Sequence, residues 1–272
     1  MYKLIALDID GTLINDNKVI TARTQEVLIH AQKNGIKVAL ASGRPAAGLN
    51  NFAKQLQLDQ YNGLLVSYNG GKVIDATTNY VLYEKSIPNP LAVKLVRKLE
   101  HYHVVPFVDD GKNMYVTDEN GFQVQHESTG NNLLPYVVTS IADEVEKRNF
   151  SPVKILIAAP QEYLQPKIAE LKEGFEEDLE FILSAPFYLE ATMKGINKAV
   201  SLHQSCQKIG IRSDEIIAFG DAQNDYAMLE YVGLGIAMGN ACEELKAIAN
   251  EVTLSNNEDG IAVALEKHLK LN

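Results

Sequence analysis

Two aspartates, Asp8 and Asp10, stand where an apolar run of the chain ends and a glycine and a threonine follow. The run at residues 4–7 contains no polar residue, which is typical of a central strand that is buried on both faces of a parallel sheet. In an extended chain, residues i and i+2 leave on the same side, so we expect the two carboxylates to lie together. Neighbouring carboxylates repel each other unless a proton or a cation relieves them. The stretch is therefore a candidate site for acid–base or metal chemistry, and an ordinary β-turn is its structural alternative.

Two later apolar runs also end in polar groups. Residues 36–41 lead into Ser42, and residues 216–219 lead through Gly220 into Asp221. A helix is predicted between the first two strands, and this strand–helix–strand order makes them parallel. Because open α/β sheets bind ligands at the carboxyl ends of their strands, we expect all these polar groups at one edge. Asp225 is also consistent with an ordinary helix start, where acidic side chains are favoured.

The residue types favour a hard cation and a phosphate group as ligands. Asp8, Asp10 and Asp221 offer oxygen atoms, which Mg²⁺ prefers together with water and phosphate oxygens. The six histidines are scattered and the two cysteines lack CxxC spacing, so the sequence shows no zinc-type cluster. Lys198 stands at the predicted start of a helix, where an ammonium group would neutralise a phosphoryl group. A solvated surface lysine is the alternative for this residue.

Composition limits the partners of the protein. The chain has 272 residues, 46% hydrophobic and 22% charged, with a formal net charge of -10. The acidic balance disfavours nucleic-acid binding but does not exclude a small phosphorylated substrate, because a bound cation and a lysine set the local field. No charged-then-apolar leader and no apolar run of about eighteen residues is seen, so we expect a cytoplasmic protein with no membrane partner. A monomer or a weak homo-oligomer is expected.

The strand pattern of the first part is interrupted in the middle of the chain. Residues 84–186 carry their own alternation of strands and helices, which indicates an inserted α/β unit. The earlier pattern resumes near Leu189 and continues through the apolar runs at residues 216–220 and 233–240. We therefore predict an α/β fold in which a doubly wound parallel sheet contains a second unit. The expected boundaries are residues 1–83 and 187–272 for the catalytic core and residues 84–186 for the insertion.

The polar stretches resemble, in order, the four motifs of the haloacid dehalogenase (HAD)-like hydrolases. The resemblance is strongest to the Cof-type phosphatases of subfamily IIB, which have a Rossmann-like core and a large inserted α/β cap domain. It covers nearly the whole chain, and Ser42 replaces the threonine that is common in the second motif while keeping its hydroxyl. The motifs are residues 8–12, 42–44, Lys198 and 220–225, and residues 67–70, 237–241 and 258–260 also resemble that branch.

The resemblance implies a role for each site residue. Asp8 would attack the phosphorus and form an aspartyl-phosphate, which splits the hydrolysis into two steps. Asp10 would protonate the leaving alcohol and then take a proton from the attacking water. Mg²⁺ is the implied cofactor, with Asp8, the backbone carbonyl of Asp10 and Asp221 as ligands and Asp225 in support. The implied phosphate-binding groups are Ser42, the amide of Gly43, Lys198 and Asn224.

The expected function is therefore Mg²⁺-dependent hydrolysis of small phosphorylated metabolites, such as sugar phosphates. Within this resemblance, Asp10 favours a phosphatase, because the corresponding motif of dehalogenases and of P-type ATPases lacks the second aspartate. Two alternatives stay open: a phosphohexomutase of the phosphomannomutase type, and a catalytically silent regulator that binds a phosphosugar. Dependence on a bisphosphorylated sugar activator would identify the mutase, and a chromogenic phosphatase assay would separate an enzyme from the regulator.

Overall fold

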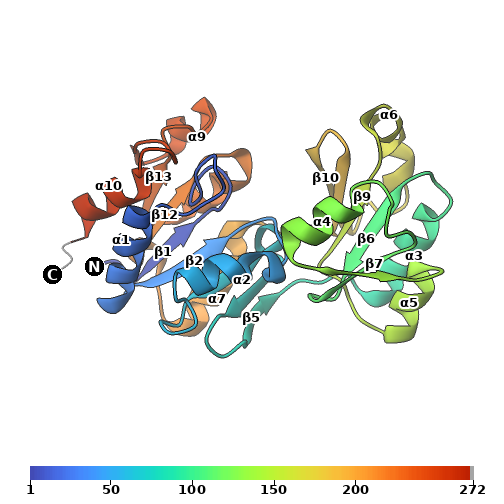
Figure 1. Ribbon diagram of the computed structural model, residues 1–272, viewed down its shortest axis with the longest axis horizontal. Helices are drawn as coiled ribbons and strands as arrows, with labels where there is room; N and C mark the ends of the chain where they lie inside the picture. Colours follow the sequence, from blue (N-terminus) through green and yellow to red (C-terminus); the bar gives the residue numbers. More distant parts are fainter. Residues whose placement is uncertain (270–272) are drawn as a thin grey trace. The chain divides into compact units, whose positions relative to one another are not determined.

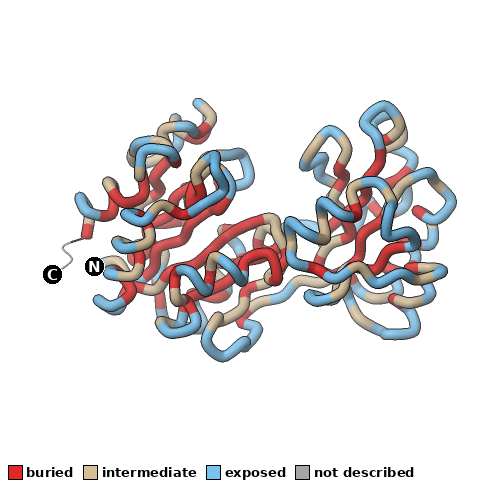
Figure 2. The backbone as a smooth tube through the Cα atoms, viewed as in Figure 1, coloured by how far each residue is buried: buried red, intermediate tan, exposed pale blue. Residues whose placement is uncertain are grey.

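The computed structural model describes residues 1–269, which form two compact units (Figure 1). The first unit contains Met1–Glu84 and the C-terminal part of the chain from Asn197, and the second contains Lys85–Ile196. Figure 2 shows that the central strands of each sheet are mostly buried, while many of the loops are exposed. Within the described residues, no helix is both long enough and apolar enough to cross a membrane.

An eight-stranded sheet forms the centre of the first unit, in the order β14-β13-β12-β1-β2-β3-β4-β5. The six strands from β14 to β3 are parallel, and β4 and β5 continue the sheet in antiparallel pairing. The chain builds outward from β1 in both directions, so β1 lies at the topological switch point, where such sheets bind ligands. The bounds are β1 (Leu4–Leu7), β2 (Lys37–Ala41), β3 (Leu64–Ser67), β4 (Lys72–Asp75), β5 (Val81–Glu84), β12 (Ile216–Gly220), β13 (Leu234–Ala237) and β14 (Glu251–Val252).

Helices cover both faces of this sheet, which confirms the predicted doubly wound α/β fold. Ile5 and Leu7 of β1 pack in one hydrophobic core with residues of α1, α2 and α10. Leu4 and Ala6 pack in a second core with residues of α7, α8 and α9. The alternation along β1 explains why its sequence is apolar at every position. The bounds are α1 (Ala22–Lys33), α2 (Ala46–Gln55), α7 (Lys198–Ile209), α8 (Tyr226–Tyr231), α9 (Glu243–Ile248) and α10 (Gly260–His268).

The second unit has a six-stranded sheet in the order β10-β11-β9-β6-β7-β8. Its pairs are antiparallel except for β7 and β8, which run parallel. One face of this sheet packs against α3, α5 and α6 to form a separate hydrophobic core. The bounds are α3 (Asn89–Leu99), β6 (Val105–Asp109), β7 (Asn113–Val116), α4 (Val124–Asn131), β8 (Leu134–Val137), α5 (Ile141–Arg148), β9 (Lys154–Ala158), α6 (Gln161–Lys172), β10 (Leu179–Ala185) and β11 (Tyr188–Met193).

The return of the chain to the first unit differs from the expected boundary after residue 186. Leu189 was expected in the first sheet, but it lies in β11 and pairs with Ile157 of β9 and Leu183 of β10. The second unit therefore continues to Ile196. A short apolar strand has the same sequence pattern in either sheet, so the local pattern alone does not reveal which sheet the strand joins.

Candidate active site

Asp8 and Asp221 follow two neighbouring parallel strands at the same edge of the first sheet. Leu7 of β1 lies beside Phe219 of β12, and the amide of Asp8 donates a hydrogen bond to the carbonyl of Phe219 at 3.1 Å. Leu7 also pairs with Leu40 of β2, so Ser42 follows the adjoining strand at that edge. The predicted gathering of strand ends is therefore a consequence of parallel pairing.

Lys198 joins two of the aspartates inside the protein. Its Nζ donates to Oδ1 of Asp8 at 2.5 Å and to Oδ1 of Asp225 at 2.6 Å, and its side chain is 0% exposed. The lysine is the first residue of α7, whose N-cap Asn197 accepts a hydrogen bond from the amide of Val200. Lys198 is therefore a buried counter-ion and not the solvated surface lysine considered as the alternative.

Asp225 has both of its carboxylate oxygens engaged. Oδ1 accepts from Lys198, and Oδ2 accepts from the amides of Asp221 at 3.0 Å and Ala222 at 3.2 Å. Gly220 permits this loop, because a Cβ there would lie 2.5 Å from the Cβ of Asp225. Asp225 thus organises the loop that carries Asp221 and also balances the charge of Lys198, which fits a supporting role.

Asp221 is held by a residue of the first motif. Thr12 Oγ1 donates to Asp221 Oδ1 at 2.9 Å. The turn that precedes Thr12 needs a glycine at position 11. Gly11 has φ +83°, and a Cβ there would lie 2.3 Å from Asp221 Oδ2. These contacts place Asp221 beside the loop that follows Asp8.

The three aspartates Asp8, Asp221 and Asp225 form a cluster that could hold a metal ion. Each offers a carboxylate oxygen, and these oxygens lie within 4.8 Å of one another. Asp8 and Asp221 each keep one carboxylate oxygen without a hydrogen bond to any described residue. Hard oxygen donors with unused lone pairs and a single neighbouring lysine suit a divalent cation. The residues present therefore fit a metal site.

Burial raises the pKa values of two carboxyl groups in the cluster, and repulsion between the aspartates adds to the shift. Burial raises the pKa of Asp8 to about 8, Lys198 opposes this shift, and Asp225 adds to it. Burial also raises the pKa of Asp221 to about 6, while the hydrogen bond from Thr12 opposes the shift. Burial alone would lower the pKa of Lys198, but the carboxylates of Asp8 and Asp225 outweigh burial and raise it. The lysine therefore stays charged, and the carboxylates would gain from a further cation.

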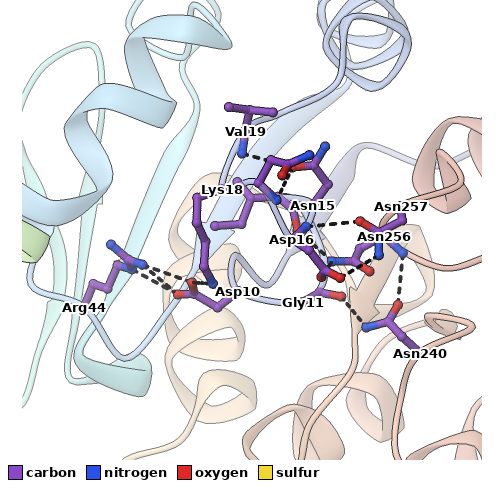
Figure 3. Close-up of polar contacts among 12 residues, drawn as sticks. Asp10, Gly11, Asn15, Asp16, Lys18, Val19, Arg44, Asn240, Asn256 and Asn257 are labelled. Carbon is purple, nitrogen blue, oxygen red and sulfur yellow. Dashed lines mark hydrogen bonds and ion pairs between the residues drawn. The ribbon is translucent and has the colours of Figure 1, made fainter.

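Asp10 makes different contacts from Asp8. Both of its carboxylate oxygens contact the guanidinium group of Arg44, and Oδ1 also accepts from Lys18 Nζ at 3.3 Å (Figure 3). The expectation that the two side chains lie together assumes an extended chain, whereas β1 ends at Leu7 and the chain then turns. The i, i+2 rule holds only in an extended strand.

The predicted phosphate-binding residues lie on three neighbouring segments. Ser42 is buried, and its Oγ accepts from the amide of Arg44 at 3.3 Å. Asn224 Nδ2 donates to Asn69 Oδ1 at 3.1 Å, and a Cβ at Gly43 would lie 3.0 Å from Asn69 Nδ2. The amide of Asn69 also donates to the carbonyl of Ser42 at 2.8 Å, so Asn69 links Ser42 to Asn224.

The sequence predicts that Thr12 hydrogen-bonds a neighbour but does not identify its partner, and it indicates no role for Arg44 or Asn69. Thr12 holds Asp221, Arg44 holds Asp10, and Asn69 joins two predicted phosphate-binding residues. All three lie within segments that resembled the family, at residues 8–12, 42–44 and 67–70. The signal was therefore present, but only the fold shows which partner each residue serves.

Comparisons with known proteins agree with the fold and the motifs. The family model described as haloacid dehalogenase-like hydrolase matches residues 5–265. A haloacid dehalogenase-like hydrolase from Bacteroides thetaiotaomicron is 35% identical, with a TM-score of 0.93 over 99% of this chain and 100% of that chain. A 5-amino-6-(5-phospho-D-ribitylamino)uracil phosphatase of Bacillus subtilis is 31% identical over 98% of both chains. A solved sugar phosphatase of HAD subclass IIB is 25% identical, with a TM-score of 0.77 over 98% of both chains. The chain therefore belongs to the haloacid dehalogenase-like hydrolases, and it is a phosphatase of their Cof-type branch.

Proposed function

We propose that this protein is a Mg²⁺-dependent phosphatase that hydrolyses small phosphorylated metabolites through an aspartyl-phosphate on Asp8. The observation that carries the proposal is the buried group of Asp8, Lys198, Asp221 and Asp225 at the switch point of the sheet. The names of two similar proteins, a sugar phosphatase and a phosphoribitylamino-uracil phosphatase, support a phosphate ester of a small polyhydroxylated compound as substrate.

In the first step, a carboxylate oxygen of Asp8 bonds to the phosphorus and the ester P–O bond breaks. The bonding electrons stay on the leaving oxygen, which takes a proton from Asp10. Lys198 keeps positive charge beside Asp8 as the phosphoryl group arrives. Asp8, the backbone carbonyl of Asp10 and Asp221 would hold Mg²⁺, with Asp225 in support. The cation supplies charge neutralisation for the phosphoryl oxygens.

In the second step, water attacks the aspartyl-phosphate. Asp10, now a carboxylate, takes a proton from the water while the water oxygen bonds to phosphorus and the P–O bond to Asp8 breaks. Inorganic phosphate and the free carboxylate of Asp8 result. Ser42, the amide of Gly43 and Asn224 hold the phosphoryl oxygens in both steps, so that the group stays in line with the attacking atom.

We also propose that the inserted unit acts as a cap that selects the leaving group. The catalytic, metal-binding and phosphate-binding residues named above all belong to the first unit, while Lys85–Ile196 has its own sheet and its own hydrophobic core. Exchanging this segment with that of a related phosphatase should move the ranking of substrates to that of the donor. If the ranking stays with the first unit, the insertion does not select the leaving group.

The proposed function is tested by a screen of phosphorylated metabolites with Mg²⁺, ranked by kcat/KM. Rapid quenching followed by mass spectrometry should detect an acid-stable, base-labile phosphate on the peptide that contains Asp8. Full turnover after exhaustive chelation would contradict the role of Mg²⁺. Phosphoryl transfer that requires a bisphosphorylated sugar would indicate a mutase, and the absence of all turnover would indicate a binding protein.

A further inference from the structure

The carboxylate of Asp10 accepts hydrogen bonds from Arg44, which lies on a separate segment of the chain. Arg44 Nη2 lies 3.0 Å from Asp10 Oδ1 and 2.9 Å from Oδ2, and Arg44 Nε lies 3.1 Å from Oδ2. Such a fork of charge-assisted hydrogen bonds fixes the plane of a carboxylate as well as its position. The side chain of Asp10 is 44% exposed. Without the fork, we expect it to sample several staggered rotamers.

Arg44 is itself held in place. Its carbonyl accepts a hydrogen bond from the amide of Tyr68 at 2.9 Å, and its amide donates to Ser42 Oγ at 3.3 Å. Its guanidinium carbon lies 5.9 Å from the ring centroid of Phe52 in α2, and its side chain is 25% exposed. The arginine therefore presents a fixed fork, because its backbone and its side chain are both restrained.

The loop that carries Asp10 is anchored from the C-terminal part of the chain (Figure 3). Asn240 Nδ2 donates to the carbonyl of Gly11 at 2.8 Å, and Asn256 Nδ2 donates to the carbonyl of Ile14 at 3.0 Å. Asn257 Nδ2 donates to Asp16 Oδ2 at 3.0 Å. These contacts fix the backbone on the C-terminal side of Asp10, so the orientation of its carboxylate is left to side-chain contacts.

Lys18 is the second cation beside Asp10, and it restrains the carboxylate less than Arg44 does. It makes one contact at 3.3 Å, and its side chain is 68% exposed. An exposed single-point ion pair contributes little, since solvent screens it and the long side chain loses entropy on pairing. Lys18 therefore serves as an internal comparison for charge without bidentate geometry.

We propose that Arg44 is the positioning residue that orients the carboxyl group of Asp10 toward the leaving oxygen, to which it gives its proton, and later orients the carboxylate toward the attacking water. This inference rests on the proposed function, in which Asp10 transfers protons in both steps. If such a group is already held in its reactive geometry, less conformational entropy is lost in the transition state, and the reaction is faster. The dependence on Arg44 should grow with the basicity of the leaving group, because a weakly basic leaving group departs without a proton.

The test compares two esters of similar shape, phenyl phosphate and p-nitrophenyl phosphate, in the presence of Mg²⁺. Their kcat/KM values report the step that releases the leaving group, and phenolate is much more basic than nitrophenolate. Arg44→Met keeps the aliphatic stem that packs near Phe52 but removes the fork. We expect it to lower kcat/KM for phenyl phosphate by about tenfold or more and that for p-nitrophenyl phosphate by less than about threefold. Arg44→Lys should fall between the wild type and Arg44→Met, because it keeps the charge but loses the bidentate geometry.

Two matched variants separate this effect from a general loss of charge or structure. Lys18→Met removes the other cation and should change either ester by less than about threefold. Arg23→Met breaks a similar fork, in which Arg23 Nε and Nη2 contact Glu266 at 3.2 and 2.7 Å, and should change neither ester. Melting curves check that each variant folds.

The outcomes distinguish the inference from the function on which it rests. Equal losses for both esters, or a raised KM for both, would show that Arg44 binds the phosphoryl group, and this would overturn the inference alone. Wild-type kcat/KM values in Arg44→Met would overturn it as well. If the wild-type protein with Mg²⁺ hydrolyses neither ester nor any metabolite of the screen, the proposed function fails and the inference fails with it.

Discussion

Each unit contains a mostly buried lysine that forms an ion pair, but the two sites differ in the number of carboxylates around the lysine. In the first unit, Lys198 contacts Asp8 and Asp225, and Asp221 completes a cluster of three carboxylates. In the second unit, Lys154 forms an ion pair with Glu190 at 3.0 Å, with side chains 11% and 14% exposed. The pair in the second unit is neutral, whereas the cluster in the first carries excess negative charge. The excess of carboxylates over lysine therefore distinguishes the candidate site from the ion pair of the second unit, which has one group of each charge.

The two sheets explain why the imbalance arises in the first unit. Neighbouring strands β12, β1 and β2 run parallel, so the polar residues that follow them meet at one edge. In the second unit, β11, β9 and β6 are antiparallel, so successive strand ends lie at opposite edges of the sheet. A parallel sheet gathers loop residues that are far apart in the sequence, and an antiparallel sheet distributes them.

The largest effect on turnover is expected for Asp8, the proposed nucleophile. Asp8→Asn should lower turnover by at least about 10⁴-fold, because an amide cannot form the acyl-phosphate. In the second unit, Glu190→Gln should leave hydrolysis of p-nitrophenyl phosphate within about threefold of the wild-type rate. Steady-state assays of both purified variants, with melting curves to show that each is folded, make the measurement. Substantial turnover by folded Asp8→Asn would remove the nucleophile assignment.

The next largest effect should follow from removing Lys198. Lys198→Met leaves Asp8 and Asp225 buried without their counter-ion, so we expect a loss of about 3–5 kcal/mol in the free energy of unfolding. Turnover should also fall by about 10²-fold or more, because the charge beside the phosphoryl group is lost. Urea unfolding and steady-state kinetics give the two quantities. A stable variant with wild-type turnover would mean that the lysine is not needed at this position.

A third prediction concerns pH and the metal. The pKa of Asp221 is raised from 3.8 to about 6, so between these values the folded protein binds more protons than the unfolded chain. The contribution of Asp221 to the stability of the metal-free protein should therefore fall as the pH rises from about 4 to 6, and Mg²⁺ should reduce this loss by stabilising the carboxylate. Asp221→Ala should remove this contribution and weaken Mg²⁺ binding, as measured by melting temperatures and calorimetry. Without metal, a difference in melting temperature between the wild type and Asp221→Ala that does not change over this interval, or that changes in favour of the wild type as the pH rises, would contradict the assignment.

The smallest effect should come from the neutral pair of the second unit. Lys154→Met leaves Glu190 without its partner and should cost about 1–3 kcal/mol of stability, with little change in turnover of p-nitrophenyl phosphate. The double variant Lys154→Met with Glu190→Leu should recover much of that stability, since no charge is left unpaired. Denaturant unfolding of the three proteins tests this point. A loss of turnover that matches Lys198→Met would break the distinction between the two units.

Local patterns in the sequence indicate which segments could carry chemistry. Apolar runs ending at Asp8, Ser42 and Asp221 predict the parallel sheet and the edge at which these polar residues gather, and the order of the motifs predicts the family. These features are readable because a strand buried on both faces must be apolar throughout, and because the residues that follow it are free to be polar. The inserted unit was visible for the same reason, as a second series of strands and helices.

The pairing of those residues depends on how distant segments pack in three dimensions. Lys198 lies 190 positions from Asp8, and no local pattern separates this buried lysine from a solvated one. The fork from Arg44 to Asp10, the double role of Asp225 and the assignment of β11 to the second sheet likewise depend on contacts between distant segments. Periodicity and propensity report the environment of each residue along its own element. The partner across the molecule is fixed only when the elements pack.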